Sequence, residues 1–545
     1  MTPADCMVAL EWDGHRWQEL ATLVEYEESA SIDSDYRARR LTVQMDLGST
    51  ALEMIAAGHH PASAVCAVWY GSGLAYQGAV SDLIPGRAGE PSTLRLVGNA
   101  IDLAAMVPSS LDVQMRQINV ARSQARQARQ EAEIAASINE AYGFAGRRPL
   151  YLTVLEPGEV APRMNGLGDG RAVVWYVETS DTVVVADRAV GRVYPWVHGQ
   201  PGVETGRVGT RAYPIDVDTQ TLMIAGHHGT EGTVSVRGPK HSATDQHARE
   251  TLTATNSYDD AGRPVMTVTV AGSSVLEHRW LTSHPEAAEA DWYVIWEGTA
   301  SGLPNNAIDV IETLLSAQSA PVDYARIESM RGELAGYTLD GVIDGRVGVW
   351  DLLQSAILPL LPVALVDTVD GVGLVRLRLD ATAADSQGPL VAGRDIDPIG
   401  RPAWQSSADP DASAHRITVS YAPSRETAAP AASVTVSAST HAAAARSLAI
   451  HGDRPREIVT GWVHRAAVAE TIARDVLQRS AVDRRVVEYA VDASVFGLGA
   501  AREIRLGDVY TVTDADEMIA DAVALVTAVR RDGSGTDVVR LLLLT

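Results

Sequence analysis

The first hundred residues alternate hydrophobic and polar side chains in short runs, which is the pattern of strands that bury one face. The Gly71-Ser72-Gly73 turn between two of these runs predicts an antiparallel hairpin. The apolar spacing at 49–57 predicts one short helix. The predicted strands are residues 7–12, 41–45, 64–70, 74–80 and 93–97. We therefore expect residues 1–105 to form a small barrel or sandwich.

A long stretch without Gly or Pro follows, and it predicts the longest helix of the chain at residues 111–141. Its apolar stripe is mostly alanine, which supplies little apolar area per residue. We expect this helix, the main feature of residues 106–145, to dock on another subunit or on the adjoining β-domain. The arginines at 116, 122, 126 and 129 are interpreted as a solvated or intersubunit face rather than a nucleic-acid site.

The next two segments differ in pattern. Residues 146–300 show β-type runs separated by frequent turn signals, which predicts an all-β module. Its expected strands are 150–155, 172–178, 182–186, 221–225, 233–236, 265–270 and 292–297. Residues 301–385 predict a mixed α/β module, in which Asn305 and Asn306 are possible N-caps. Its expected elements are helices at 307–319, 322–335 and 349–358 and a strand at 337–343.

The end of the chain, residues 386–545, shows the same pattern of short strands with one helix as the beginning. Two low-complexity stretches, 405–413 and 422–433, should be loops around a strand at 416–421. A helix is expected at 465–480, with strands at 485–491, 509–513, 522–530 and 537–544. Short strands plus one helix thus occur at both ends of a β-rich, multidomain chain.

Composition narrows the class of function. The chain has 545 residues, enough for about three or four domains. Its 45 basic and 69 acidic residues give a net charge of −24, which disfavours a protein that wraps duplex DNA. Cys6 and Cys66 are too few for a disulfide scaffold or a four-thiolate metal site, so free, buried thiols are expected. The start lacks a signal-peptide pattern, and the most apolar run, 356–366, is short and broken by proline. We expect a soluble protein made in a cytoplasm.

The motifs of common enzymes are missing from the sequence. The only lysine, Lys240, stands in no phosphate-binding GxxxxGK[ST] loop, and no HExxH or GxSxG pattern occurs. The pairs His59-His60 and His227-His228 are weak metal candidates, because adjacent residues on a strand face opposite ways. The sequence therefore predicts no catalytic, cofactor-binding or metal-binding residue and no cofactor.

A carbohydrate-related alternative stays open. A glycosidase needs only two carboxyl groups at the right separation, and the acidic candidates include Asp340, Asp344, Asp367 and Asp370. Exposed aromatic residues could bind sugars. Packing in the core is the default interpretation for most of five tryptophans, because most of them lie in strand or helix patterns: Trp69, Trp196, Trp292, Trp296 and Trp350.

A series of short motifs runs in order along nearly the whole chain. They are YQGAVSDLIPGRAGEPSTLRLVG at 76–98, YPWVHGQPG at 194–202, LMIAGH at 222–227, NNAIDVIETLLSAQSAPVDYARIESMRGELAGYTLDGVIDG at 305–345, Trp350 with ILPLLPV at 357–363, HRITVSYAP at 415–423 and IRLGDVYTVTD at 504–514. Together they resemble the tail hub proteins of long-tailed bacteriophages and gene transfer agents, of the Mu-like and siphophage type. The resemblance would make His227 a structural family residue. The predicted helix at 111–141 fits it least well.

The resemblance implies a β-rich α+β fold with two tube-like barrels, each with one short helix, at 1–105 and 386–545. It also implies a structural virion protein of the tail tip, made in the host cytoplasm, and no enzyme. The homotrimer would close the distal tail tube and adapt its sixfold symmetry to a threefold fibre. Its partners would be the distal tail or tail tube protein, a central fibre or tip protein and the tape measure protein. DNA would pass without specific binding and no membrane insertion would be stable. The alternative is a cell-wall-active glycosidase or a carbohydrate-binding tail protein.

The acidic charge leads to one more expectation. In a channel for DNA, carboxylates would repel the phosphates, so much of the charge should face the channel. The arginines should then gather at subunit and partner interfaces, where they pair with carboxylates. The alternative is an evenly mixed surface whose acidity only aids solubility.

Overall fold

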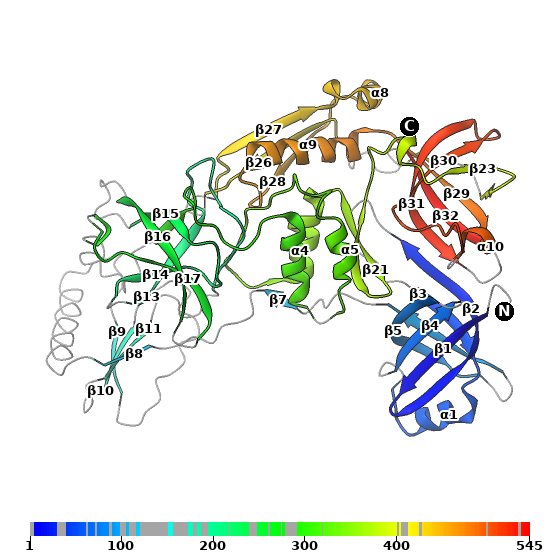
Figure 1. Cartoon of the computed structure of the whole chain (residues 1–545), viewed down its shortest axis with the longest axis horizontal. Coiled ribbons are helices and arrows are strands. Elements are labelled where there is room, and N and C mark those ends of the chain that lie inside the picture. Colours follow the sequence, from blue (N-terminus) through cyan, green and yellow to red (C-terminus); the bar gives the residue numbers. More distant parts are fainter. Residues whose placement is uncertain are drawn as a thin grey trace.

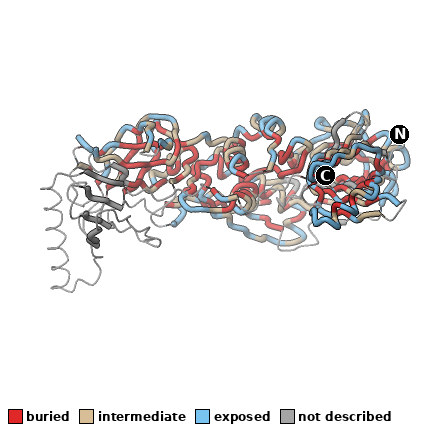
Figure 2. Tube along the Cα trace, turned by 90° about the horizontal axis from the view of Figure 1, so that it is seen from below, coloured by how far each residue is buried: buried red, intermediate tan, exposed pale blue. Residues whose placement is uncertain are grey.

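The protein is elongated, and its elements form three groups. The computed structural model describes residues 5–29, 40–60, 64–70, 73–86, 90–98, 105–107, 116–119, 151–155, 173–177, 182–186, 194–216, 219–238, 248–259, 262–273, 275–277, 292–318, 320–399, 403–404, 413–424, 428–497, 500–531 and 536–544. Two barrels lie at one end, a mixed block lies in the middle, and a third barrel lies at the other end (Figure 1). Buried segments run through all three groups (Figure 2). Within the described ranges, no helix is long and apolar enough to cross a membrane.

The beginning of the chain forms a closed six-stranded barrel, the first barrel. Its strands are β1 (Asp5–Trp12), β2 (His15–Ser29), β3 (Arg40–Met45), β4 (Val65–Tyr70), β5 (Gly73–Ile84) and β6 (Ser92–Val97), with helix α1 (Gly48–Ala56). The strand order is β1-β4-β5-β6-β3-β2, and β1 pairs with β2 to close the ring. Alternate residues of β3 face the core, where Leu41, Val43 and Met45 are buried. The predicted β4–β5 hairpin is confirmed. Strand β2 was not predicted.

The end of the chain forms a second, nearly closed barrel. Its strands are β23 (Pro389–Val391), β24 (Ile396–Pro398), β25 (Ala403–Trp404), β29 (Arg485–Asp492), β30 (Val509–Asp514), β31 (Ile519–Arg531) and β32 (Thr536–Leu543), with helix α10 (Ala493–Phe496). Strand β23 pairs with β30, whereas β24 pairs with β29. A parallel bridge between Ala392 and Ile396 joins these two short strands across the remaining gap. The expected pair of barrels with one short helix each is therefore confirmed.

The third barrel lies at the far end of the molecule. Its closed ring contains β13 (Thr210–Asp216), β14 (Thr221–Ala225), β15 (Gly232–Arg237), β16 (Arg249–Tyr258), β17 (Pro264–Thr269) and β18 (Trp292–Ile295). A small sheet contains β8 (Arg116–Asn119), β9 (Tyr151–Leu155), β10 (Val173–Val177) and β11 (Thr182–Ala186). The all-β expectation for this part of the chain is confirmed.

The prediction of a helix at 111–141 is wrong for residues 116–119. Residues 116–119 form β8, which pairs antiparallel with the valine-rich β11. The backbone of this segment forms its hydrogen bonds with a strand of β-branched residues. The helical pattern in the sequence gives no sign of this partner. The rest of the predicted helix, including the alanine stripe at 125 and 128, lies outside the described residues.

The central block combines two stretches of sequence around one hydrophobic core. The first, together with β7 (Met106–Val107) and β12 (Trp196–Val197), supplies α4 (Ala307–Ser316), α5 (Tyr324–Ser329), β19 (Val342–Ile343), β20 (Val347–Gly348), α6 (Val349–Leu352), the π-helix η2 (Leu353–Ile357), the short helix η3 (Leu358–Leu360), β21 (Val363–Thr368) and β22 (Gly371–Arg376). The second supplies β26 (Arg416–Tyr421), β27 (Ala432–Ser437), η5 (Ala438–Thr440), α8 (Ala442–His451), β28 (Pro455–Val459) and α9 (Ala466–Ala481). The short helix η4 (Ala383–Asp385) instead contacts β30 of the second barrel. Helix α9 covers β26 and β27.

Two elements of this block are shorter than predicted. Helix α5 covers Tyr324–Ser329, whereas 322–335 was predicted. Asp323 is its N-cap, because its side chain accepts a hydrogen bond from the Arg326 amide (2.9 Å). The predicted strand at 337–343 retains only Val342 and Ile343. The Tyr337 and Asn305 carbonyls accept the amides of Ala307 and Leu339, and these two hydrogen bonds form an isolated antiparallel bridge between Asn306 and Thr338 in place of a longer strand.

Candidate functional site

The first and second barrels are joined by a strand pairing. Residues 26–29 of β2 pair antiparallel with residues 528–531 of β31. Strand β2 has 15 residues against 8 in β1, so its first half closes the first barrel and its end reaches the second. The two barrels therefore lie side by side as one unit built from both ends of the chain (Figure 1). We call this unit the barrel pair.

A buried ion pair lies next to this link. The Arg531 guanidinium donates to the Asp537 carboxylate (2.9 Å), and each side chain is only 5% exposed. Glu503 lies 3.8 Å from the same guanidinium, and the Ile504 carbonyl accepts from it at 3.3 Å. Arg531 is also the residue of β31 that pairs with Tyr26 of β2. Removing one member of such a pair leaves an uncompensated buried charge at the link.

A second junction connects the third barrel to the central block. It is the loop at residues 196–202, which we call the joint loop. On the barrel side, the Val197 amide donates to His227 Nε2 (2.9 Å), and the Gln200 side chain donates to the carbonyls of Gly298 and Ala300 (2.9 Å each). His227 directly follows the end of β14, so the loop is fastened to the barrel wall.

The central block holds the same loop through a buried carboxylate. Asp340 is fully buried, and its Oδ1 accepts from the Gln200 amide (3.0 Å) and the Asn305 side chain (2.7 Å). Its Oδ2 lies 3.2 Å from Arg465 Nε. Gly199 has φ +62°, and an added Cβ would lie 2.0 Å from Asp340 Oδ1. A carboxylate in this position can therefore bind the loop only because residue 199 has no side chain.

The joint brings two of the sequence motifs into contact. The Gly226 amide donates to the Pro195 carbonyl (2.8 Å), so the 222–227 motif lies against the 194–202 motif. A Cβ on Gly226 would lie 2.2 Å from the Tyr194 Cβ. His227 Nδ1 donates to the His228 carbonyl (2.9 Å), and burial lowers the pKa of His227. His227 thus links backbone segments in its neutral form.

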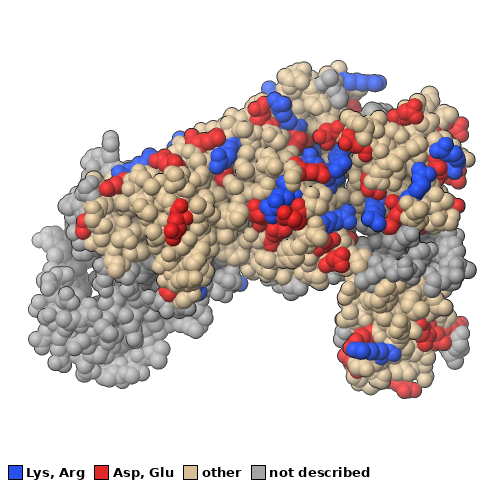
Figure 3. Space-filling view, viewed as in Figure 1, with Lys and Arg blue, Asp and Glu red and all other residues tan. Residues whose placement is uncertain are grey.

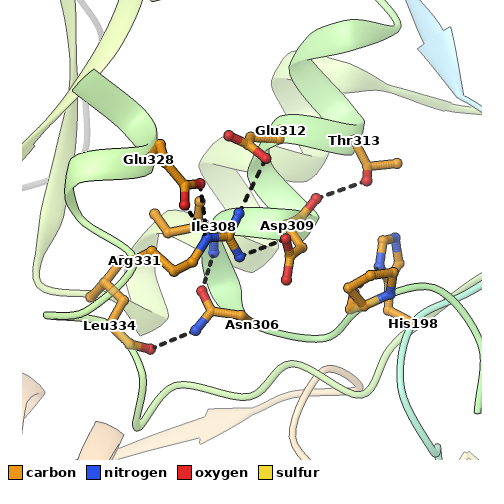
Figure 4. A network of polar contacts seen from close by, with 10 residues as sticks. His198, Asn306, Ile308, Asp309, Glu312, Thr313, Glu328, Arg331 and Leu334 are labelled. Atoms are coloured by element: carbon orange, nitrogen blue, oxygen red, sulfur yellow. Dashed lines mark hydrogen bonds and ion pairs between the residues drawn. The ribbon is translucent and has the colours of Figure 1, made fainter. Parts of the chain in front are cut away.

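An ion-pair network continues from the joint into the helices. Asn306 caps α4 by accepting the Ile308 amide (2.9 Å). Behind this cap, Arg331 contacts Asp309 (2.7 Å), Glu328 (2.7 Å) and Glu312 (3.5 Å), so one guanidinium ties α4 to the turn after α5 (Figure 4). Every carboxylate of this network is engaged with the arginine, and the arrangement is structural.

The acidic glycosidase candidates do not form a catalytic pair. Asp340 is committed to the joint, Asp367 is buried, and Asp344 and Asp370 are exposed. An open groove of about 450 Å³ does lie beside the joint, with Pro359, Val459 and Trp462 among its lining residues. None of the described residues that line this groove is Asp or Glu. The pair of carboxyl groups that glycoside hydrolysis requires is therefore not found at the groove.

One hydroxyl–imidazole contact resembles part of a catalytic triad. Ser447 Oγ lies 3.0 Å from His415 Nε2, but both residues are buried. The nearby Asp483 contacts His451 (3.3 Å) instead of His415. A triad needs an accessible hydroxyl and a carboxylate on the far side of the same imidazole, so this cluster does not meet the requirement.

The remaining candidates have structural contacts. His59 pairs with Asp13 (2.7 Å), and His228 Nε2 donates to the Ser257 carbonyl (2.8 Å). Among the residues that the structure describes, no group of three or more His, Cys, Asp or Glu is placed to hold a metal ion. Trp292 and Trp296 are fully buried, as expected of core residues, while Trp69, Trp196 and Trp350 are partly buried. Cys6 and Cys66 are buried thiols that form no disulfide, as predicted.

Sequence reasoning missed the segment that completes the joint. Trp462, His464 and Arg465 contact it: His464 Nδ1 accepts the Gly202 amide (2.8 Å), a Cβ on Gly341 would lie 2.1 Å from the Trp462 ring, and Arg465 binds Asp340. This segment is more than a hundred residues from Asp340 in the sequence and matches no local motif. No periodicity or spacing could have placed it there.

Comparisons with solved structures return two tail proteins and one virion chain, each at low sequence identity. One is the 43 kDa tail protein of prophage MuSo2 from Shewanella oneidensis, with 12% identity, a TM-score of 0.34 and 98% of both chains covered. Another is the tail protein from Neisseria meningitidis MC58, with 9% identity, a TM-score of 0.38 and 98% of this chain and 96% of that chain covered. A third is a chain from the virion of a native gene transfer agent particle, with 12% identity and a TM-score of 0.34. The match covers 65% of this chain and 84% of that chain. No protein-family model and no curated protein matches the sequence.

Proposed function

We propose that this chain is a structural tail protein of a long-tailed bacteriophage or gene transfer agent, and that three copies form the hub at the distal end of the tail tube. The barrel pair is the observation that supports this most directly. The barrel pair supplies two barrels from each chain, so three chains place six barrels in a ring, which fits a sixfold tube while the trimer fits a threefold fibre.

The position of the motifs on the fold supports the same proposal. The motif at 76–98 contains β6 and most of β5 in the first barrel, and the motif at 504–514 contains β30 in the second barrel. The motifs at 194–202, 222–227 and 305–345 meet at the joint. Segments that resemble tail hub proteins thus form the barrels and the connection between the outer barrel and the central block.

The proposed role assigns partners by position. The barrel ring would contact the distal tail or tail tube protein and the end of the tape measure protein. The central block and the third barrel would hold a central fibre or tip protein. DNA would pass through the ring without specific binding. The protein would be made in the host cytoplasm and found in the virion.

The proposal is tested by the oligomeric state of the purified chain. Light scattering should give three times the mass of one chain, and negative-stain images should show a hollow ring. A chain that stays monomeric across the micromolar range would overturn the hub. A preparation that clears peptidoglycan, and loses this activity on changing one Asp or Glu to Ala, would support the glycosidase alternative instead.

A further inference from the structure

The joint loop is held from both sides by histidine rings that accept backbone hydrogen bonds. The Val197 amide donates to His227 Nε2 (2.9 Å), and the Gly202 amide donates to His464 Nδ1 (2.8 Å). A backbone N–H can only donate, so each of these ring nitrogens carries a lone pair and no proton. The loop is therefore fastened at both ends by unprotonated nitrogens.

The other nitrogen of each ring is also assigned by its partner. His227 Nδ1 lies 2.9 Å from the His228 carbonyl, and His464 Nε2 lies 3.3 Å from the Gly461 carbonyl. A carbonyl can only accept, so these nitrogens carry the ring proton. A protonated imidazole has two donors and no acceptor, and it would have to release the amide of Val197 or Gly202.

The two rings anchor the loop to different bodies. His227 follows β14 of the third barrel and is 8% exposed, whereas His464 precedes α9 of the central block and is 3% exposed. A charge at either place would be buried next to an N–H dipole of the same sign, so the closed joint resists protonation. Burial accordingly lowers the pKa of His227.

We infer that the joint loop is an acid-sensitive latch, in which protonation of His227 and His464 frees residues 196–202 and loosens the third barrel from the central block. The latch is closed at neutral pH, when both rings accept. The closed state loses stability as the pH falls from the range where a free imidazole gains its proton toward the lowered pKa of the buried ring. This inference stands on the joint alone and does not depend on the proposed hub.

Other titratable groups also lie at the joint. His198 donates through Nδ1 to the Pro304 carbonyl (3.0 Å), and burial lowers its pKa to about 4, so its protonation adds to the loss of the closed state at low pH. Asp340 binds Arg465, and Glu204 accepts the Ala466 amide (2.8 Å). A measurement between pH 7.5 and pH 5 covers the range in which a free imidazole gains its proton. His228, which packs against His227, donates to the Ser257 carbonyl and keeps that bond when protonated.

Hydrogen exchange of the full chain tests the latch. For one histidine with an ordinary unfolded pKa near 6.5, the open population rises about 30-fold between pH 7.5 and pH 5. After correction for intrinsic exchange rates, the amides of Val197 and Gly202 should lose protection by about this factor or more. Amides in the core of the first barrel should not. Protection at Val197 and Gly202 that stays constant down to pH 5 in the wild-type chain would overturn the inference.

Variants that cannot titrate provide the matched control. His227→Gln places an amide oxygen near the Nε2 position, and His464→Asn places one near the Nδ1 position, so both can still accept the loop amides. The double variant should lose less protection than the wild type between pH 7.5 and pH 5, with His198 accounting for the loss that remains. His15→Gln, which changes an exposed histidine of the first barrel, should behave as the wild type. A double variant that loses protection at the same pH as the wild type would also contradict the latch.

Discussion

Glycine residues determine how closely the segments of the joint approach each other. Gly199 leaves space for the carboxylate of Asp340, and Gly226 leaves space for Tyr194. Both lie in sequence motifs that could be recognised, but the reason for the glycine is visible only when the second segment is in place. The partners that meet at Asp340 come from residues 200, 305 and 465, and no local pattern predicts that they converge.

The close contact at Gly226 leads to a prediction for stability. Gly226→Ala should lower the free energy of unfolding by about 2 kcal/mol, because its Cβ would overlap the Tyr194 Cβ and backbone. Gly345→Ala is the control, since a Cβ there meets no atom within 4 Å. Urea unfolding followed by tryptophan fluorescence compares the two. Equal midpoints for both variants would show that the 194–202 segment moves aside at little cost.

Asp475 leads to a prediction for pH dependence. This carboxyl group lies on α9 and accepts a hydrogen bond from the Tyr337 hydroxyl, and burial raises its pKa to about 6. The folded state therefore binds a proton more tightly than the unfolded state, where the pKa is near 3.8. Above pH 6 the buried charge costs stability, and this cost decreases as the pH falls toward 4.

Asp475→Asn removes that charge and keeps an acceptor for Tyr337. The variant should be more stable than the wild type by roughly 1 kcal/mol at pH 7.5, and the difference should shrink at pH 4.5. Thermal unfolding at the two pH values measures it, with the exposed Asp370→Asn as the control. A variant that is less stable at pH 7.5 would mean that the ionised Asp475–Tyr337 contact is favourable.

At the scale of elements, alternation in the sequence predicted strands well where one face is buried. Strands β3, β6, β31 and β32 lie close to their expected positions. Strand β2 was missed, although it connects the two barrels. Its sequence, HRWQELATLVEYEES, is rich in Glu and lacks clear alternation. It is a strand because β1, β3 and β31 pair with it along its edges, and such tertiary pairing overrides local preference.

The link between β2 and β31 can be tested with proline. Backbone amides of a strand alternate in direction, so one of Glu27 and Glu28 donates toward β31 and the other donates away from it. We expect one of the two single variants, Glu27→Pro or Glu28→Pro, to separate the barrels without unfolding either. Small-angle scattering should show a larger radius of gyration for that variant, and circular dichroism should stay unchanged. Unchanged scattering from both variants would mean that side-chain contacts hold the barrel pair.

The end of helix α9 depends on one buried arginine. Arg484 is 2% exposed and donates to the carbonyls of Gln478 (2.6 Å), Arg479 (3.1 Å) and Val482 (3.4 Å). These carbonyls belong to the last turn of α9 and its C-cap, where a cation is favourable. Burial lowers the pKa of Arg484 to about 10, which leaves it charged at neutral pH.

Arg484→Met should therefore destabilise the protein by about 2 kcal/mol, because the helix carbonyls lose their donors while staying buried. The matched control is Arg474→Met on the same helix, where the side chain is 67% exposed. Chemical unfolding of both variants gives the comparison. Equal stability of the two would show that water replaces the guanidinium at the helix end.

At the scale of the whole molecule, the fold class could be predicted and the arrangement could not. Two barrels with a short helix each were expected from the chain ends. The shared core of 307–374 and 414–481 was not, because the elements between them, including β23 and β24, belong to the second barrel. The order of elements along the chain does not show that the chain leaves the central block for the second barrel and then returns. Charge is equally hard to place from sequence, and acidic and basic groups lie close together on the face that Figure 3 shows.

The last prediction concerns where the acidic charge lies in the proposed trimer. Three copies of a chain with net charge −24 carry −72, and DNA that passes a ring must not be held by it. Each Lys or Arg contact to a phosphate adds affinity through counterion release, whereas a wall of carboxylates repels the phosphates. We expect acidic groups to outnumber basic groups on the channel wall, and the purified trimer to leave duplex DNA unshifted in gels at about 0.15 M salt. An image reconstruction of the trimer would locate the wall, and a basic DNA-binding protein of similar mass is the control for the gels. A neutral or positive wall, or a shift of the DNA at that salt, would show that the acidity serves solubility and not passage.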